Sequence, residues 1–256
     1  MEIKKLPSFS DHSLSFIGPD LDVGPLPALF YFALAAQESL GKDPYNQPAA
    51  YLSSLPMRIF SMDVPHHGPG LSSETALIQW ASEFARGKNI ISHYVDTVCQ
   101  TLDQLIQQNV LIPDKIAVAG LSRGAFLATH VAARYSPIQW ILGFAPLTQV
   151  GLGKDFQEIK ESPLLKELDL ETLIPQLTSR KLRFYIGNLD HRVSTRSCFN
   201  FIENLSLTAQ KHSIRSPSVE LIISPSIGFQ GHGTPKKIFH QGAQWIAEQL
   251  GAIDVV

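Results

Sequence analysis

Cysteine is scarce in this chain of 256 residues, and so is charge. Cys99 and Cys198 have no C-x-x-C spacing and no partner motif, which argues against a disulfide framework or a cysteine-ligated metal. Charged residues make up 17% of the chain and the formal net charge is −2, so the composition does not attract nucleic acid or anionic membranes. We expect two reduced thiols in a cytoplasmic protein without a nucleic-acid partner.

Long hydrophobic runs are also missing. The longest, ALFYFALAA at 28–36, is less than half of what a membrane-spanning helix needs. The segment MEIKKLPSFSDHSLSF has two lysines but no apolar run behind them, so we expect neither a signal peptide nor a membrane span. The run at 28–36 instead fits a strand that is buried on both faces, as a parallel sheet requires.

Apolar strand-like runs alternate with amphipathic helix-like runs. The candidate strands are 29–32, 57–63, 115–119, 138–144, 182–186 and 219–223. Apolar spacings of three and four predict a helix over 91–106, and a last helix has Pro235 in its first turn and Gly251 just after it. The alternation predicts an α/β fold with a central, mostly parallel sheet flanked by helices. Nothing divides the composition, so we expect a single domain over 1–256.

One charged segment, 151–180, breaks this alternation. It is helical in type, carries two prolines, and separates two strands that should be neighbours. We predict a short cap over the carboxyl end of the sheet. An ordinary crossover helix with a long loop fits the same pattern, and the sequence does not decide between them.

The stretch KIAVAGLSRGAFLATHVAARY, 115–135, encloses a serine between two glycines where a strand becomes a helix. A serine oxygen attacks a carbonyl only when it stands clear of the fold beside a general base. A sharp strand-to-helix turn exposes Ser122, and the close approach of strand and helix leaves no room for side chains at Gly120 and Gly124. The G-x-S-x-G motif alone is weak, but its position between strand and helix predicts Ser122 as a nucleophile, in preference to a plain glycine turn.

Within this context, VAGLSRGAFLATH resembles the serine elbow of the α/β-hydrolase superfamily, in its prolyl-oligopeptidase-like and dienelactone-hydrolase-like branches. The resemblance extends from about residue 27 to the C-terminus. It implies an α/β-hydrolase fold and a triad in the chain order serine, acid, histidine. Two later stretches, GNLDHRV and GHGTP, resemble the acid and histidine motifs of that superfamily.

These two stretches supply the other candidate catalytic residues. Asp190 stands in the polar turn after the strand at 182–186, where a carboxylate can orient a histidine and stabilise its charged form. His232 lies between two glycines in the loop after the next strand and is the predicted general base. The alternative acids, both in the segment 151–180, are Asp155 and Asp169. The remaining alternative bases are His130, His191, His212 and His240.

An oxyanion needs two donors. One is predicted to be the backbone N–H of Arg123, and the other the N–H of Ala35, although its loop lacks the His-Gly that is common in relatives. The turn DVPHHGPG, 63–70, makes His66 and His67 candidates for lining the pocket, while a metal site there is disfavoured because adjacent side chains point apart. For the Arg123 side chain we favour a salt bridge at the elbow over recognition of a substrate carboxylate.

The motifs together predict a serine hydrolase that cleaves a carboxylic ester or related acyl bond through an acyl-enzyme, without metal or organic cofactor. The expected partner is a small-molecule ester, thioester or short peptide, and no segment indicates an oligomer interface. A serine peptidase acting on short peptides is the first alternative. A non-catalytic binding protein that keeps the hydrolase fold is the second, because one fold hosts many functions.

Overall fold

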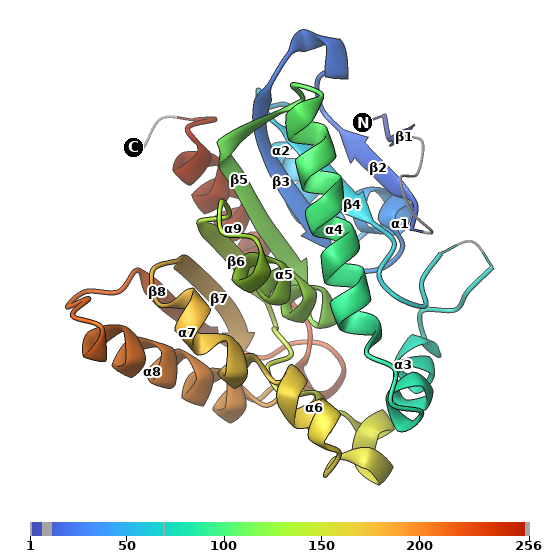
Figure 1. Ribbon diagram of the computed structural model, residues 1–256, viewed down its shortest axis with the longest axis vertical. Coiled ribbons are helices and arrows are strands. Elements are labelled where there is room, and N and C mark those ends of the chain that lie inside the picture. Colours follow the sequence, from blue (N-terminus) through green and yellow to red (C-terminus); the bar gives the residue numbers. More distant parts are fainter. Residues whose placement is uncertain (1, 7–11, 69, 254–256) are drawn as a thin grey trace.

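The computed structural model describes residues 2–6, 12–68 and 70–253, and a twisted sheet forms its centre (Figure 1). The described strands form one eight-stranded sheet in the order β1-β2-β4-β3-β5-β6-β7-β8. They are β1 (Lys4–Leu6), β2 (Leu14–Ile17), β3 (Leu26–Phe32), β4 (Arg58–Met62), β5 (Leu111–Leu121), β6 (Trp140–Phe144), β7 (Lys181–Gly187) and β8 (Val219–Ser224). From β4 to β8 neighbours pair in parallel, whereas β2 is antiparallel to both β1 and β4. The prediction of a mostly parallel sheet is confirmed.

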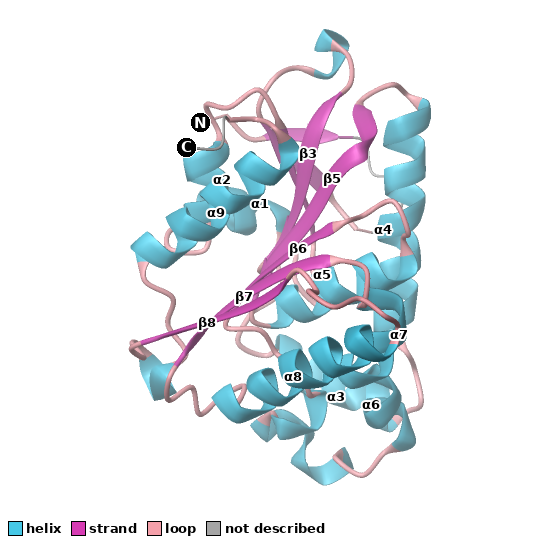
Figure 2. Ribbon diagram, turned by 90° about the vertical axis from the view of Figure 1, so that its left-hand side faces the viewer, coloured by secondary structure: helices cyan, strands magenta, loops and turns pink. Residues whose placement is uncertain are grey.

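Helices cover both faces of the sheet (Figure 2). The described α-helices are α1 (Ala36–Gly41), α2 (Gln47–Leu52), α3 (Ala76–Ala85), α4 (Ile90–Gln107), α5 (Arg123–Arg134), α6 (Pro163–Leu168), α7 (Ile174–Leu177), α8 (Thr195–Lys211) and α9 (Lys236–Leu250). The helices α1, α2 and α9 pack on one face, and α4, α5 and α8 on the other. Within the described ranges, no helix combines the length and apolarity that crossing a bilayer requires.

Burial on both faces explains the apolar runs. Along β3, Phe30 and Phe32 belong to the core beneath α4 and α5, while Leu29 and Tyr31 belong to the core beneath α9. Side chains of a strand alternate between faces, so a strand covered on both sides has no polar positions. The helix predicted over 91–106 is confirmed as α4. The Asn89 side chain caps this helix by accepting a hydrogen bond from the backbone N–H of Ser92 in the first turn.

Within the run 28–36, the strand predicted over 29–32 is confirmed. The strand β3 ends at Phe32, and α1 begins at Ala36. The chain turns here because the Ala36 N–H donates to the Asp63 carboxylate, at 2.7 Å, while the Leu34 carbonyl accepts from the Val64 N–H at 3.2 Å. Both partners follow β4, so a contact distant in sequence ends the strand.

The segment 151–180 forms short helical pieces. Two 3-10 turns, Val150–Leu152 and Lys154–Ile159, precede α6, and a third, Leu170–Leu173, leads into α7. The later pieces pack against α5 and α8, on the face of the sheet that α4, α5 and α8 cover. The earlier ones lie beyond the carboxyl ends of the strands, near α3 (Figure 1).

Candidate active site

Ser122 occupies a strained turn between β5 and α5. Its backbone has φ 57° and ψ −116°, outside the regions that non-glycine residues normally adopt. A Cβ on Gly120 would lie 2.1 Å from the Gly124 carbonyl carbon, and one on Gly124 would lie 1.9 Å from the Phe32 carbonyl oxygen. The prediction that both glycines are required by close packing is therefore confirmed.

Replacing Gly124 with alanine is expected to destabilise the protein by about 3 kcal/mol or more, because the obstructing atom belongs to the backbone of β3 and cannot rotate away. Gly151→Ala is the matched control, since a Cβ there meets nothing closer than 3.5 Å, and its effect should stay within about 0.5 kcal/mol. Denaturant unfolding measures both. Equal midpoints for the two variants would contradict the steric account of the elbow.

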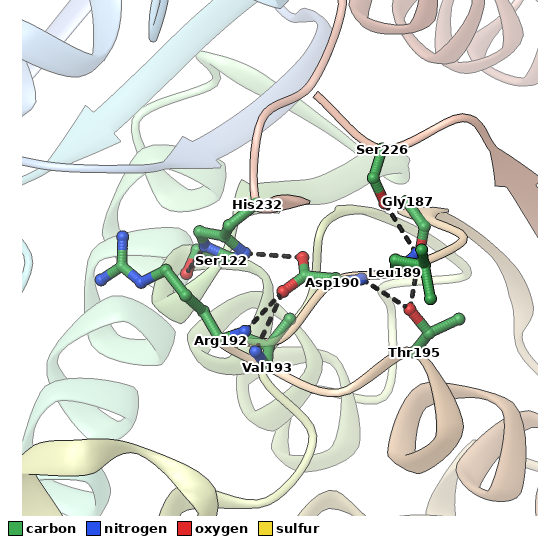
Figure 3. A network of polar contacts seen from close by, with 9 residues as sticks. All are labelled: Ser122, Gly187, Leu189, Asp190, Arg192, Val193, Thr195, Ser226 and His232. Atoms are coloured by element: carbon green, nitrogen blue, oxygen red, sulfur yellow. Dashed lines mark hydrogen bonds and ion pairs between the residues drawn. The ribbon is translucent and has the colours of Figure 1, made fainter. Parts of the chain in front are cut away.

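Three side chains from distant parts of the chain meet at the carboxyl edge of the sheet (Figure 3). His232 Nε2 lies 2.9 Å from Ser122 Oγ, and His232 Nδ1 lies 2.7 Å from Asp190 Oδ2. A carboxylate only accepts, so Nδ1 carries the proton and Nε2 presents a lone pair to the serine. Sequence order and strand context thus brought together the three residues that we predicted.

The carboxylate of Asp190 is fixed from several sides. Its Oδ1 accepts the backbone N–H groups of Arg192 and Val193, at 3.0 and 3.1 Å. Its own N–H donates to Thr195 Oγ1, and that hydroxyl donates to the Gly187 carbonyl. The side chain is completely buried, so these donors replace the water that an ionised carboxylate would otherwise bind.

The glycines beside His232 permit close packing of its loop against the Asp190 turn. A Cβ on Gly231, whose φ is 75°, would lie 2.1 Å from the Leu189 carbonyl oxygen, and one on Gly233 would lie 2.8 Å from the Ile227 carbonyl oxygen. The backbones also join directly, because the His191 N–H donates to the Gln230 carbonyl at 2.9 Å. The loop therefore sets the imidazole position through its backbone.

The alternative acids and bases lie outside the hydrogen-bonded chain that joins Asp190, His232 and Ser122. The side chain of Asp155 makes no hydrogen bond with any described residue, and the Asp169 carboxylate accepts the Val150 N–H at 3.0 Å. His130 is held between α5 and the Leu168 carbonyl, 2.9 Å from Nε2, and burial lowers its pKa to about 4. None of them contacts His232.

The loop after β3 leaves one amide free beside the elbow. The Leu34 N–H donates to Ser39 Oγ at 2.9 Å, and the Ala36 N–H donates to Asp63. Between them, the Ala35 N–H has no acceptor among the described residues. This is the amide that we predicted from the sequence as the second oxyanion donor.

The first predicted donor, the Arg123 N–H, is also without an acceptor in the described part of the chain. Arg123 is the first residue of α5, where backbone N–H groups have no partner within the helix and the helix dipole favours an anion. The contact of Gly124 with Phe32 brings this helix end against the loop that carries Ala35. The two free amides thus belong to adjoining segments.

A hollow of about 460 Å³ opens onto Ser122 and His232. Its apolar wall includes Leu77, Leu147 and Phe156, and the segment 152–157 borders it. Another hollow, of about 470 Å³, is lined by Asp190 and Thr195 among others, but neither Ser122 nor His232 belongs to its lining. The first is therefore the candidate substrate pocket.

His66 and His67 do not line this hollow, contrary to the expectation from their turn. His67 is buried, at 5% exposure, behind Arg123. Its Nδ1 lies 3.0 Å from the Pro65 carbonyl oxygen, which fixes the proton on Nδ1, and its Nε2 accepts from Arg123 Nη1 at 3.4 Å. Among the described residues, no group of three or more His, Cys, Asp or Glu side chains could hold a metal ion.

The expected salt bridge of Arg123 is also absent from the described part of the chain. Its Nη1 instead donates to two neutral acceptors, His67 Nε2 and the Ser73 carbonyl at 3.3 Å. Burial, with the nearby positive charge of Arg192, lowers the pKa of Arg123 to about 10. The guanidinium therefore keeps its charge at neutral pH.

Comparison with known proteins identifies the fold. No family model and no curated protein matches the chain. It is similar to a proposed dipeptidyl aminopeptidase IV from Bacteroides ovatus, with a TM-score of 0.70 and 17% identity over 98% of this chain but only 35% of that one. The S-formylglutathione hydrolase of Staphylococcus aureus gives 0.64 and 14% over 96% of each chain. Acetyl xylan esterase 1 of a Thermoanaerobacterium species gives 0.63 and 16%, over 98% of this chain and 88% of that one. The predicted α/β-hydrolase fold is confirmed.

Proposed function

Starting from this fold, we propose that the protein is a serine hydrolase that cleaves a carboxylic ester or related acyl bond of a small molecule. The observation that carries the proposal is the hydrogen-bonded chain from Asp190 through His232 to Ser122. Such a chain gives a serine the general base that it needs. The likeness to an S-formylglutathione hydrolase and an acetyl xylan esterase supports acyl-transfer chemistry.

In the proposed mechanism, His232 Nε2 takes the proton of Ser122 as its oxygen attacks the substrate carbonyl. The N–H groups of Arg123 and Ala35 hold the resulting oxyanion. His232 then gives the proton to the leaving alkoxide, and an acyl-enzyme remains on Ser122. A water molecule, deprotonated by His232, attacks this ester, and His232 returns the proton to the leaving Ser122 oxygen as the acid is released. Asp190 stabilises the imidazolium in both halves of the reaction.

The segment 151–180 is proposed to act as a short cap of a single domain. Its residues 152–157 border the hollow, so their side chains would contact the substrate. The rest of the segment packs against α5 and α8 and anchors this border. Acyl-chain preference would depend on the apolar wall that includes Phe156.

A serine peptidase acting on short peptides is the second candidate. The likeness to a proposed dipeptidyl aminopeptidase IV supports it. The triad would work in the same way, with His232 protonating a leaving amine in place of an alkoxide. An esterase should hydrolyse p-nitrophenyl esters much faster than aminoacyl naphthylamides, whereas a peptidase should cleave both.

The test combines a p-nitrophenyl ester series, from acetate to long acyl chains, with labelling by a fluorophosphonate probe. Turnover together with labelling at Ser122 would support the hydrolase, and the preferred chain length would measure the acyl pocket. Labelling without ester turnover would favour amide substrates. A folded protein that neither turns over nor labels would contradict the proposal and favour a binding protein on the same fold.

A further inference from the structure

We propose that Arg123 and Arg192 select substrates that carry an anionic group, such as a carboxylate, near the bond to be cleaved. The inference rests on the proposed hydrolase function and names the class of substrate. Charged side chains line the hollow beside Ser122. Three cations, Arg123, Arg192 and Lys154, face one carboxylate, that of Asp155.

These cations form no ion pair with any described residue, and the one nearby carboxylate, Asp155, acts on Arg123 only at longer range. The ion pairs of the described residues all join other groups, and Asp155 lies beyond ion-pair distance of each cation. The side chains of Arg192 and Lys154 make no hydrogen bond with any described residue. The hollow therefore has a net excess of two positive charges, and a bound anion would reduce it.

Arg123 is held in place without losing its charge. His67, buried and with its pKa lowered to about 4 mainly by burial, is neutral at pH 7 and offers Nε2 as an acceptor. The second acceptor, the Ser73 carbonyl, is also uncharged. Burying a cation without an opposite charge is costly, and neutral acceptors compensate only part of that cost. A substrate carboxylate would supply the missing charge.

The free donors of Arg123 suit a carboxylate. Both hydrogen bonds of its guanidinium use Nη1, which leaves Nε and Nη2 without acceptors in the described part of the chain. These two atoms form one edge of the planar fork, and that edge binds the two oxygens of a carboxylate in parallel. Lysine has no comparable edge, so a charge alone would bind less specifically.

Both arginines lie beside the triad in sequence and in space. Arg123 follows Ser122 directly, and Arg192 follows Asp190 by two positions. The two arginines share the hollow with Ser122 and His232. In Figure 3 the Arg192 guanidinium extends on the Ser122 side of the Asp190 turn, away from Thr195. An anion bound here would lie close to the reacting carbonyl.

Two pairs of esters test the inference. Mono-4-nitrophenyl adipate and its methyl ester differ by one negative charge on the acyl side. The butyrate ester of 4-hydroxybenzoate and that of its methyl ester differ in the same way on the alcohol side. We expect wild-type protein to prefer the anionic member of one pair in kcat/KM, and the pair that responds identifies the side. Equal kcat/KM values in both pairs would overturn the inference.

Variants then assign the preference to the arginines. Arg123→Met should lower the ratio of anionic to neutral kcat/KM by roughly 10- to 100-fold, and Arg123→Lys should restore part of it. Arg192→Met should lower it less, because this residue is exposed. Arg196→Met is the control, since Arg196 is an exposed arginine that lines the other hollow. An unchanged ratio in both Arg123→Met and Arg192→Met would also overturn the inference.

Fluorophosphonate labelling separates the two possible failures. If Ser122 labels while the esters show no charge preference, the hydrolase stands and the anion selectivity is wrong. If folded wild-type protein neither labels nor turns over, the proposed function fails and the selectivity fails with it. The ratio of anionic to neutral kcat/KM is measured on wild-type protein alone. The inference can therefore be tested even if the Arg123→Met variant does not fold.

Discussion

Ser122→Ala is expected to lower kcat for p-nitrophenyl esters by about a million-fold, the scale seen when a triad serine is removed from a serine hydrolase. The nucleophilic oxygen is lost, and His232 Nε2 loses its partner at 2.9 Å. The backbone of the turn is set by packing around Gly120 and Gly124, so the variant should fold normally. The expected loss therefore reflects chemistry alone.

Single-turnover kinetics at high enzyme concentration, with the fold checked by circular dichroism, measures this loss. Ser206→Ala is the control, because that serine only donates to the Ile202 carbonyl within α8. It should keep wild-type kcat and fluorophosphonate labelling. If Ser122→Ala kept a tenth or more of the activity, Ser122 would not be the nucleophile.

Ser122→Gly extends the same experiment to backbone strain. Alanine at this position keeps the unfavourable φ of 57°, whereas glycine adopts it freely. Strain of this kind costs on the order of 1–3 kcal/mol, from which the greater freedom of glycine in the unfolded chain subtracts about 0.4–1 kcal/mol. Ser122→Gly should therefore be inactive like Ser122→Ala but more stable by about 1 kcal/mol in denaturant unfolding. A less stable glycine variant would contradict strain at the elbow.

The sequence predicted the interior of the sheet well, because both-face burial makes β3, residues 116–121 of β5, and β6 continuous apolar runs. It also predicted which three residues meet in the candidate site, since each of Ser122, Asp190 and His232 follows a strand that the pattern revealed. The two strands at the β1 end of the sheet, β1 and β2, were not predicted. They have three and four residues, and β1 includes two lysines, so neither shows a periodic signal.

What the sequence could not give were contacts between distant segments. The end of β3 depends on Asp63, which accepts the Ala36 N–H from 27 positions away. The partner of Arg123 was predicted to be a carboxylate, and it is the neutral ring of His67, 56 positions earlier. A residue's type says that it needs a partner, but only the fold decides which partner is near.

Asp190→Asn is expected to lower kcat by about 10⁴-fold, by analogy with the same change in a serine protease triad. The Asp190 carboxylate accepts on both sides, from the N–H groups of Arg192 and Val193 and from His232. An asparagine has one oxygen and one NH₂ group. If the oxygen keeps the backbone donors, the NH₂ group faces Nδ1 and moves the ring proton to Nε2, where the imidazole can no longer accept the proton of Ser122.

The reverse orientation of the amide has a different cost. The NH₂ group would then face two backbone donors inside the protein, which leaves buried groups unpaired at about 1–3 kcal/mol each. The first orientation should therefore dominate, giving a folded protein with the wrong histidine tautomer. Kinetics on p-nitrophenyl esters, together with denaturant unfolding, separates loss of activity from loss of stability.

Asp155→Asn and Asp169→Asn are the matched controls, because they are the other acids that the sequence offered. Asp155 lines the hollow and Asp169 accepts the Val150 N–H, but neither contacts His232. Both variants should keep kcat for neutral esters within a few-fold of wild type. A thousand-fold loss in either one, with Asp190→Asn nearly unchanged, would transfer the role of triad acid to the segment 151–180. Losses confined to Asp190→Asn would tie general-base catalysis to the hydrogen bond at His232 Nδ1.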